Sequence, residues 1–184
     1  MKKSSGKKLN SLQNPKSEIT RAFIMDKIFH GLSLIEGIVS GYFRYITLKI
    51  RAEKIGTGLI INSDSLIIHT AKLRVGNNVS IGRRSFISAK GGLTIGNNVL
   101  IAFDCVILTE EHIYGKNVVI WESGFTTAPV TIGNNVLIGT KAIIMPGVSI
   151  GDNVVIGAHS VVTKSIPSNC VAAGIPARVI KKIK

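Results

Sequence analysis

Residues 131–162 read TIGNNVLIGTKAIIMPGVSIGDNVVIGAHSVV, and an aliphatic residue returns in them at every sixth position. The members of this series are Ile132, Ile138, Ile144, Ile150, Ile156 and Val162. A fixed short repeat is typical of a solenoid, because one repeat cannot bury its own apolar face and stacked repeats can. We therefore predict that each hexapeptide forms one short strand and one corner, with the aliphatic residue pointing inward.

The repeat extends back toward Ile55 and implies a definite stacking. Its earlier members include Val75, Ile81, Ile87, Ile95, Ile101 and Ile107. If three hexapeptides close one coil, Ile132 lies under Ile150, and every strand pairs with the coils above and below. Gly-Asn-Asn and Gly-Asp-Asn triplets recur between the strands, and these residues tolerate the positive φ that tight corners need. The sequence thus predicts an all-β solenoid.

Composition narrows the classes of function. The 184 residues carry a formal net charge of +13, so nucleic acid, an acidic membrane surface and a polyphosphate cofactor all fit as partners. The sequence has no nucleic-acid motif, and we expect no nucleic-acid partner. Cys105 and Cys170 form no CxxC pair, which favours small buried side chains over a zinc or redox motif. No cleavable signal is recognisable, and this favours the cytoplasm.

Three segments of the chain differ in composition and in the spacing of their apolar residues. Residues 1–17 are rich in Lys, Ser and Asn and are predicted to be disordered. Residues 18–54 have the spacing of an amphipathic helix, with apolar positions at Ile24, Ile28, Leu32, Ile35, Val39, Tyr42, Ile46 and Ile50. Residues 55–184 contain the repeat, which is interrupted at 88–92 and by a long loop over 108–129. Interruptions of a solenoid form projecting loops, and such loops often carry function.

The helical segment has two interpretations that the sequence leaves open. Charged residues such as Lys27 and Glu36 interrupt any stretch long enough to cross a bilayer, so a transmembrane helix is not expected. The apolar stripe could lie on the inner surface of the membrane, where Lys27, Arg44, Lys49 and Arg51 would meet anionic headgroups. The same stripe could instead pack on the first coil, because the open end of a solenoid needs a cap.

The second half of the chain resembles the hexapeptide-repeat acetyltransferases, in particular the sugar and exopolysaccharide O-acetyltransferases. The stretches that carry the resemblance are TIGNNVLIA (94–102), PVTIGNNV (129–136), PGVSIGDN (146–153), GAHSVVTK (157–164) and AGIPARVI (173–180). The resemblance implies a left-handed parallel β-helix with a short closing segment, although the general rule for parallel crossovers favours right-handed connections. It also implies acetyl-CoA as co-substrate, a sugar or glycan acceptor, and a homotrimer with active sites between subunits.

His112 is the catalytic residue that the resemblance implies. It lies in the long loop, ten residues beyond Ala102, and family members keep this interval. A sugar hydroxyl is a weak nucleophile, and an imidazole can accept its proton as the oxygen attacks the thioester. Glu110 and Glu111 could orient the imidazole or could be solvated loop residues.

Other candidate residues would line the binding sites for the acceptor and the cofactor. Ser88, Lys90 and Trp121 lie in the two interruptions, which are natural walls for an acceptor. Family enzymes often have an acidic residue in the first interruption, where this chain has Lys90. Trp121 could stack on a sugar ring or pack against a neighbouring subunit. By resemblance, the residues at CoA contact positions are Thr140, Ala158, Thr163, Lys164, Arg178 and Lys181.

Three functions are compatible with this sequence. The first is O-acetylation of a capsule, exopolysaccharide or lipopolysaccharide precursor by a cytoplasmic enzyme, either free or held peripherally at the inner face of the membrane. The second is N-acetylation of an amino sugar nucleotide or a xenobiotic. The third is a non-catalytic scaffold, against which the His112 interval and the CoA set argue. A zinc enzyme on this solenoid would need a histidine where the chain has Asn117, so no metal is expected.

Overall fold

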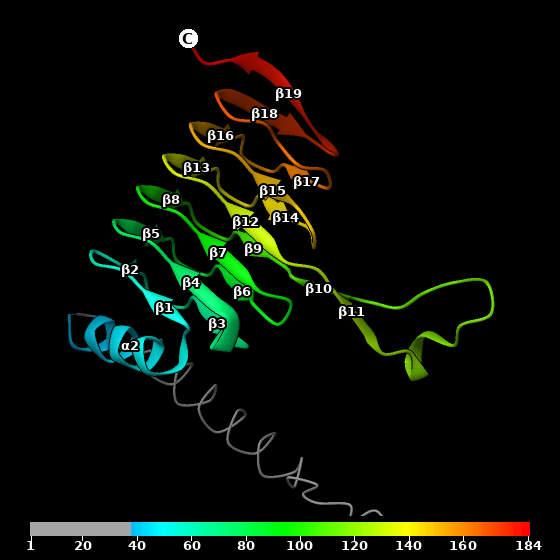
Figure 1. Ribbon diagram of the computed structural model, residues 1–184, viewed down its shortest axis with the longest axis horizontal. Helices are drawn as coiled ribbons and strands as arrows, with labels where there is room; N and C mark the ends of the chain where they lie inside the picture. Colours follow the sequence, from blue (N-terminus) through cyan, green and yellow to red (C-terminus); the bar gives the residue numbers. More distant parts are fainter. Residues whose placement is uncertain (1–37) are drawn as a thin grey trace, which may run out of the picture.

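The computed structural model describes residues 38–184, and its body is a solenoid of short parallel strands (Figure 1). The strands form three parallel sheets, named here A, B and C, and the chain visits them in that order in each coil. This is the predicted left-handed parallel β-helix. The predicted disordered tail over 1–17 and the first part of the predicted helix, 18–37, lie outside the described residues.

Each sheet collects one strand from each successive coil. Sheet A consists of β1 (Lys54–Ile55), β4 (Leu73–Val75), β7 (Leu93–Ile95), β12 (Val130–Ile132) and β15 (Ser149–Ile150). Sheet B consists of β2 (Ile60–Ile61), β5 (Val79–Ile81), β8 (Val99–Ile101), β13 (Val136–Ile138), β16 (Val154–Ile156) and β18 (Cys170–Gly174). Sheet C consists of β3 (Leu66–Ile68), β6 (Phe86–Ser88), β9 (Val106–Ile107), β14 (Ile143–Ile144) and β17 (Val161–Val162). Strand β19 (Ala177–Lys182) pairs antiparallel with β18 and completes the predicted closing segment.

The register of the strands confirms the predicted stacking. Ile132 pairs with Ile150, and Ile138 pairs with Ile156. All four side chains are at most 2% exposed, so each coil covers the aliphatic residues of its neighbours. The corner asparagines adopt positive φ, as predicted, and those with φ between 53° and 60° are Asn78, Asn98, Asn135, Asn153 and Asn169.

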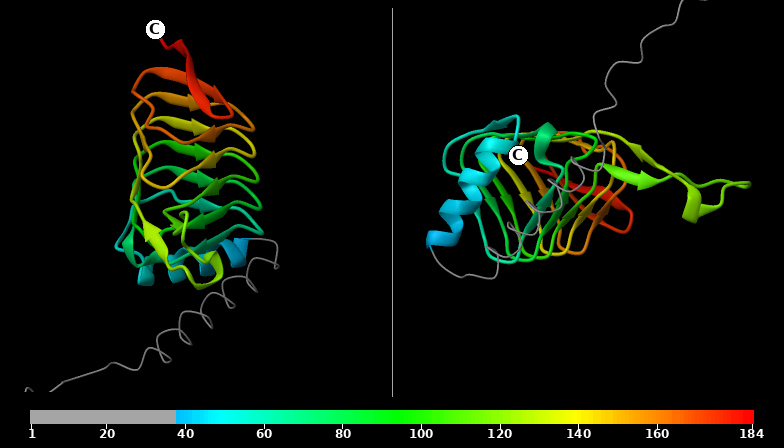
Figure 2. Two further views of the ribbon diagram at one scale, coloured as in Figure 1. Left: turned by 90° about the vertical axis from the view of Figure 1, so that its right-hand side faces the viewer. Right: turned by 90° about the horizontal axis from the view of Figure 1, so that it is seen from below.

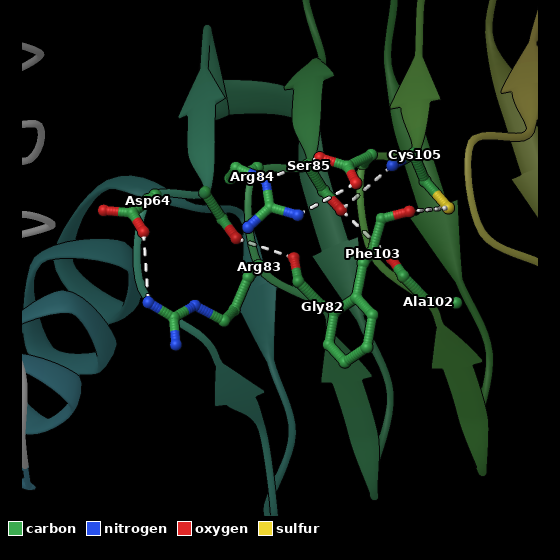
Figure 3. Close-up of polar contacts among 10 residues, drawn as sticks. Asp64, Gly82, Arg83, Arg84, Ser85, Ala102, Phe103 and Cys105 are labelled. Carbon is green, nitrogen blue, oxygen red and sulfur yellow. Dashed lines mark hydrogen bonds and ion pairs between the residues drawn. The ribbon is translucent and has the colours of Figure 1, made fainter.

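Polar contacts between successive coils hold the corners where sheet B turns into sheet C (Figure 3). The Ser85 hydroxyl donates to the Ala102 carbonyl (3.2 Å) and accepts from the Cys105 N–H (3.3 Å). On the outside, the Arg84 guanidinium donates to both Asp104 carboxylate oxygens (2.8 and 3.0 Å), which holds the pKa of Asp104 below its usual range. Cys105 is fully buried, and burial raises the pKa of its thiol. Its predicted role as a small buried side chain is confirmed.

Helix α2 (Ile38–Arg51) covers the open end of the first coil (Figures 1 and 2). Its most buried side chains are Arg44 and Leu48, which are 1% and 2% exposed. The Arg44 guanidinium donates to the backbone carbonyls of Asn62 (2.8 Å) and Ile61 (3.4 Å). Strand β2 is the edge of sheet B, so α2 supplies donors that a preceding coil would otherwise provide.

The buried face of α2 is not the one predicted. The predicted stripe runs through Tyr42 and Ile50, yet these side chains are 63% and 78% exposed. The expectation that Arg44 meets lipid headgroups is also wrong, because Arg44 lies under the coil. The physical reason is that edge carbonyls need a donor, and a guanidinium satisfies them where an apolar side chain cannot. No helix within residues 38–184 is long and apolar enough to cross a bilayer.

Candidate active site

The candidate residues gather mainly on the edge of the solenoid where sheet C turns into sheet A. Both predicted interruptions, at 88–92 and 108–129, lie on this edge, and so does a third, the 3-10 helix η1 (Thr70–Lys72). This third interruption was not predicted, although Ile67 and Val75 are eight residues apart, as are Ile87 and Ile95 at the predicted interruption. The edge residues stack coil on coil: the Leu108 N–H, for example, donates to the Ile144 carbonyl at 3.0 Å.

The long loop forms a β-hairpin that projects from the third coil (Figures 1 and 2). Strand β10 (Glu110–His112) pairs antiparallel with β11 (Phe125–Thr127), and His112 lies opposite Phe125. The two ring centroids are 4.1 Å apart, with 41° between the ring planes. The phenyl ring therefore packs on the exposed imidazole and restrains its orientation. Near the tip, the 3-10 helix η2 (Ile120–Glu122) carries Trp121, which is 94% exposed.

A charged cluster connects the start of the hairpin, at Glu110, to the 88–92 interruption. The Ser88 hydroxyl donates to one Glu110 carboxylate oxygen at 3.0 Å, and the Lys90 ammonium lies 3.6 Å from the other. Lys90 Nζ also lies 4.1 Å from the centroid of the Phe125 ring, in cation–π geometry. Since the same ring contacts His112, the predicted candidates Ser88, Lys90, Glu110 and His112 form one contiguous group with Phe125.

The two glutamates beside His112 differ in their surroundings. Successive residues of a strand point to opposite faces, so Glu110 shares a face of β10 with His112 and Glu111 does not. Within residues 38–184, no hydrogen bond or ion pair joins either glutamate to His112, and Glu110 instead contacts Ser88 and Lys90. The contact that orients the imidazole comes from Phe125, which sequence reasoning missed. Its only signal was an aromatic residue on the returning strand.

Four of the six residues predicted to contact CoA occupy two edges of the solenoid. Thr163 and Lys164 follow β17 and so share the hairpin's edge. Thr140 and Ala158 follow β13 and β16 on the opposite side of sheet C, at the edge between sheets B and C. The remaining two lie on β19, with Arg178 opposite Ala173 and Lys181 opposite Val171. One protomer thus does not bring all six together around His112. Among residues 38–184, no three His, Cys, Asp or Glu side chains are grouped to hold a metal ion.

The fold is a solenoid of hexapeptide coils with a projecting hairpin that carries a histidine. Comparison with known proteins identifies the family of proteins that has this fold. The family model described as bacterial transferase hexapeptide matches residues 129–164, and the hexapeptide repeat of succinyl-transferase matches residues 72–107. A comparison with curated protein sequences gives no match.

Solved structures extend the comparison to most of the chain. A maltose O-acetyltransferase from Clostridium difficile 630 is 32% identical, with a TM-score of 0.78, over 91% of this chain and 89% of its own. A galactoside acetyltransferase in complex with coenzyme A is 29% identical, with a TM-score of 0.81, over 95% of this chain and 85% of its own. A hexapeptide-repeat acetyltransferase from Vibrio cholerae shares the fold, with 20% identity and a TM-score of 0.78, over 95% of this chain and 93% of its own. The chain belongs to the hexapeptide-repeat acetyltransferase family and is an acyltransferase.

Proposed function

We propose that this enzyme transfers the acetyl group of acetyl-CoA to a hydroxyl of a sugar or glycan, with His112 as general base. The observation that carries the proposal is an exposed imidazole, packed against the tilted ring of Phe125, in a hairpin on the edge that also bears Thr163 and Lys164. A maltose O-acetyltransferase and a galactoside acetyltransferase among the relatives support a sugar acceptor. The coenzyme A bound to the galactoside enzyme supports the co-substrate.

The reaction needs one proton carrier. The acceptor oxygen attacks the thioester carbonyl carbon while its proton passes to a ring nitrogen of His112. The carbon–sulfur bond then breaks, and the imidazolium returns the proton to the CoA thiolate, so the products are an acetyl ester and CoA. Phe125 keeps the imidazole on the acceptor side of the hairpin, and the Ser88–Glu110–Lys90 contacts keep the hairpin root fixed.

The active site forms between the subunits of a homotrimer. The outward residues of sheet A are polar, namely Lys54, Arg74, Thr94, Thr131 and Ser149. Those of sheet B are mostly aliphatic, namely Ile60, Ser80, Leu100, Leu137, Val155 and Val171. Sheet C presents Leu66, Phe86, Val106, Ile143 and Val161. Two apolar faces of three need cover, and a neighbouring subunit supplies it.

A trimer also explains the division of the CoA residues between two edges. His112, Thr163 and Lys164 on one subunit face Thr140 and Ala158 on the next, with the pantetheine arm between them. The exposed Trp121 reaches the neighbour. The basic side chains Lys164, Arg178 and Lys181 pair with the CoA phosphates.

The enzyme acts on a capsule, exopolysaccharide or lipopolysaccharide precursor at the inner face of the cell membrane. Support comes from the outer face of α2, where Tyr42, Phe43 and Ile50 are 63%, 49% and 78% exposed beside the exposed Lys49. Apolar side chains flanked by a cation are the composition of an interfacial helix. In this arrangement the inner face of α2 caps the solenoid and the outer face meets lipid.

Mass spectrometry of acetyl transfer tests the proposal. The purified chain is incubated with acetyl-CoA and pairs of sugars that differ only in a hydroxyl or an amine at one carbon. Acetylation of the hydroxyl member supports the proposal. Transfer to the amine alone would replace it with N-acetylation, and CoA release without any acetylated sugar would contradict a sugar acceptor.

A further inference from the structure

A basic pocket lies on the same edge as His112, one coil below the hairpin. It has a volume of about 400 Å³ and is lined by Arg51, His69, Thr70, Ala71, Lys72 and Lys90. Three of these residues, Arg51, Lys72 and Lys90, are basic, and no lining residue is acidic. The pocket therefore favours an anionic ligand.

Three elements build this pocket. Arg51 ends α2, His69 to Lys72 form the corner of the first coil, and Lys90 comes from the corner of the second. The two corners lie close together, because a Cβ placed on Gly92 would be 4.0 Å from Lys72 Cβ. The cap and two stacked coils thus bring the three basic residues to one pocket.

The wall of the pocket contains a buried hydroxyl without a partner. Thr70 is 3% exposed, and within residues 38–184 its Oγ1 has no hydrogen-bond partner. Buried hydroxyls are almost always hydrogen-bonded, since leaving one unsatisfied costs stability. A shift of the Thr70 side chain toward the pocket would let a ligand oxygen satisfy it.

Lys90 connects the pocket to the proposed base. Its ammonium lies 4.1 Å from the Phe125 ring centroid, and that ring lies 4.1 Å from the His112 ring. Glu110 offsets part of the Lys90 charge at 3.6 Å. A ligand whose anionic end occupies the pocket would extend its other end toward the imidazole.

We propose that this pocket binds a phosphate group of the acceptor, so that the acceptor is a glycosyl phosphate or diphosphate rather than a neutral glycoside. The proposal rests on the acetyl transfer proposed above. Lys72 and Arg51 pair with the phosphate oxygens, and the Thr70 hydroxyl donates to one of them. Lys90 bridges phosphate and sugar, and the sugar hydroxyl then faces His112. The phosphate belongs either to a soluble nucleotide sugar or to a lipid-linked glycan.

Matched acceptors test the proposal on the full chain. Methyl glucoside, glucose 1-phosphate and UDP-glucose are compared as acetyl acceptors, together with a polyprenyl diphosphate-linked glucose in vesicles. We expect the specificity constant to be at least about tenfold higher for the phosphorylated sugars. Better turnover of UDP-glucose or of the lipid-linked sugar identifies the source of the phosphate. Equal specificity constants for methyl glucoside and glucose 1-phosphate would overturn the proposal.

Variants assign the preference to the pocket. Lys72→Glu is expected to reduce the ratio of the two specificity constants about tenfold or more, and Thr70→Val to reduce it by a smaller factor. Lys54→Glu makes the same charge change on the outer face of sheet A and should leave the ratio unchanged. A loss of CoA affinity in Lys72→Glu would assign the pocket to the cofactor and refute an acceptor role.

Calorimetry with glucose 1-phosphate separates this proposal from the proposed function. Binding that Lys72→Glu abolishes supports the pocket even if no acetyl transfer is detected, in which case only the proposed reaction fails. Absence of binding to the unmodified chain contradicts the pocket, whatever the turnover of neutral sugars.

Discussion

Individual side chains at the hairpin root decide how well His112 is positioned. The imidazole is exposed, so no core packing holds it, and its restraint comes from one aromatic neighbour. That neighbour, Phe125, is itself held by strand pairing and by the Lys90 ammonium. Each contact is weak alone, and their combination at one point restrains the orientation of an exposed loop histidine.

We predict that Phe125→Ala lowers kcat about three- to tenfold. The substitution removes a ring–ring contact of the strength typical of aromatic pairs, and the imidazole then samples unproductive orientations. Phe125→Tyr keeps the ring and should keep kcat. Steady-state kinetics with acetyl-CoA measures both variants. Unchanged kcat in Phe125→Ala would show that His112 does not depend on this contact.

Helix α2 and the projecting hairpin are the two elements that depart from the regular coil. The helix satisfies the edge carbonyls of the first coil through Arg44, a buried guanidinium that an amphipathic pattern would place outside. The hairpin leaves the solenoid from the third coil and carries the candidate base.

Arg44→Met should destabilise the solenoid by about 1–3 kcal/mol, because the carbonyls of Ile61 and Asn62 lose their donor under the cap. Thermal unfolding at neutral pH measures the effect as a lower Tm. Lys49→Met removes an exposed charge from the same helix and serves as the control. If both variants melted together with the unmodified chain, α2 would not be a stabilising cap.

The outer face of α2 predicts binding to anionic vesicles. The double substitution Tyr42→Ser and Ile50→Ser should reduce vesicle binding of the full chain by removing exposed apolar area, and should leave Tm nearly unchanged. Flotation with vesicles of anionic phospholipid at low salt measures it. Failure of the unmodified chain to float with these vesicles would disprove contact through this helix.

Features that follow from a short sequence interval could be predicted from the sequence, and features that depend on a distant strand could not. Ile132 and Ile150 repeat at a fixed interval, so their stacking could be predicted without coordinates. The His112 loop could be located because it interrupts that interval. The burial of Arg44 could not be predicted, because its cause is an edge carbonyl on a distant strand. The contact of Lys90 with Phe125 depends on hairpin pairing that no local pattern indicates.

For the whole molecule, the distribution of apolar surface predicts the assembly. The outward residues of sheets B and C are mostly aliphatic, whereas those of sheet A are polar. We predict that Leu137→Lys, in the middle of sheet B, dissociates the trimer and abolishes activity. Thr131→Lys places the same charge on sheet A in the same coil and should preserve both. Sedimentation equilibrium gives the masses, and a stable, active monomer of the unmodified chain would refute a shared site.

We propose that His112 takes the proton of the acceptor hydroxyl. The most direct measurement is the rate of acetyl transfer by His112→Ala, made alongside its Tm and its affinity for CoA. Loss of a positioned base predicts a rate about 100- to 10,000-fold lower, with Tm and CoA affinity nearly unchanged, because the His112 side chain is exposed and lies outside the core. Near-full turnover by this variant would contradict the assignment.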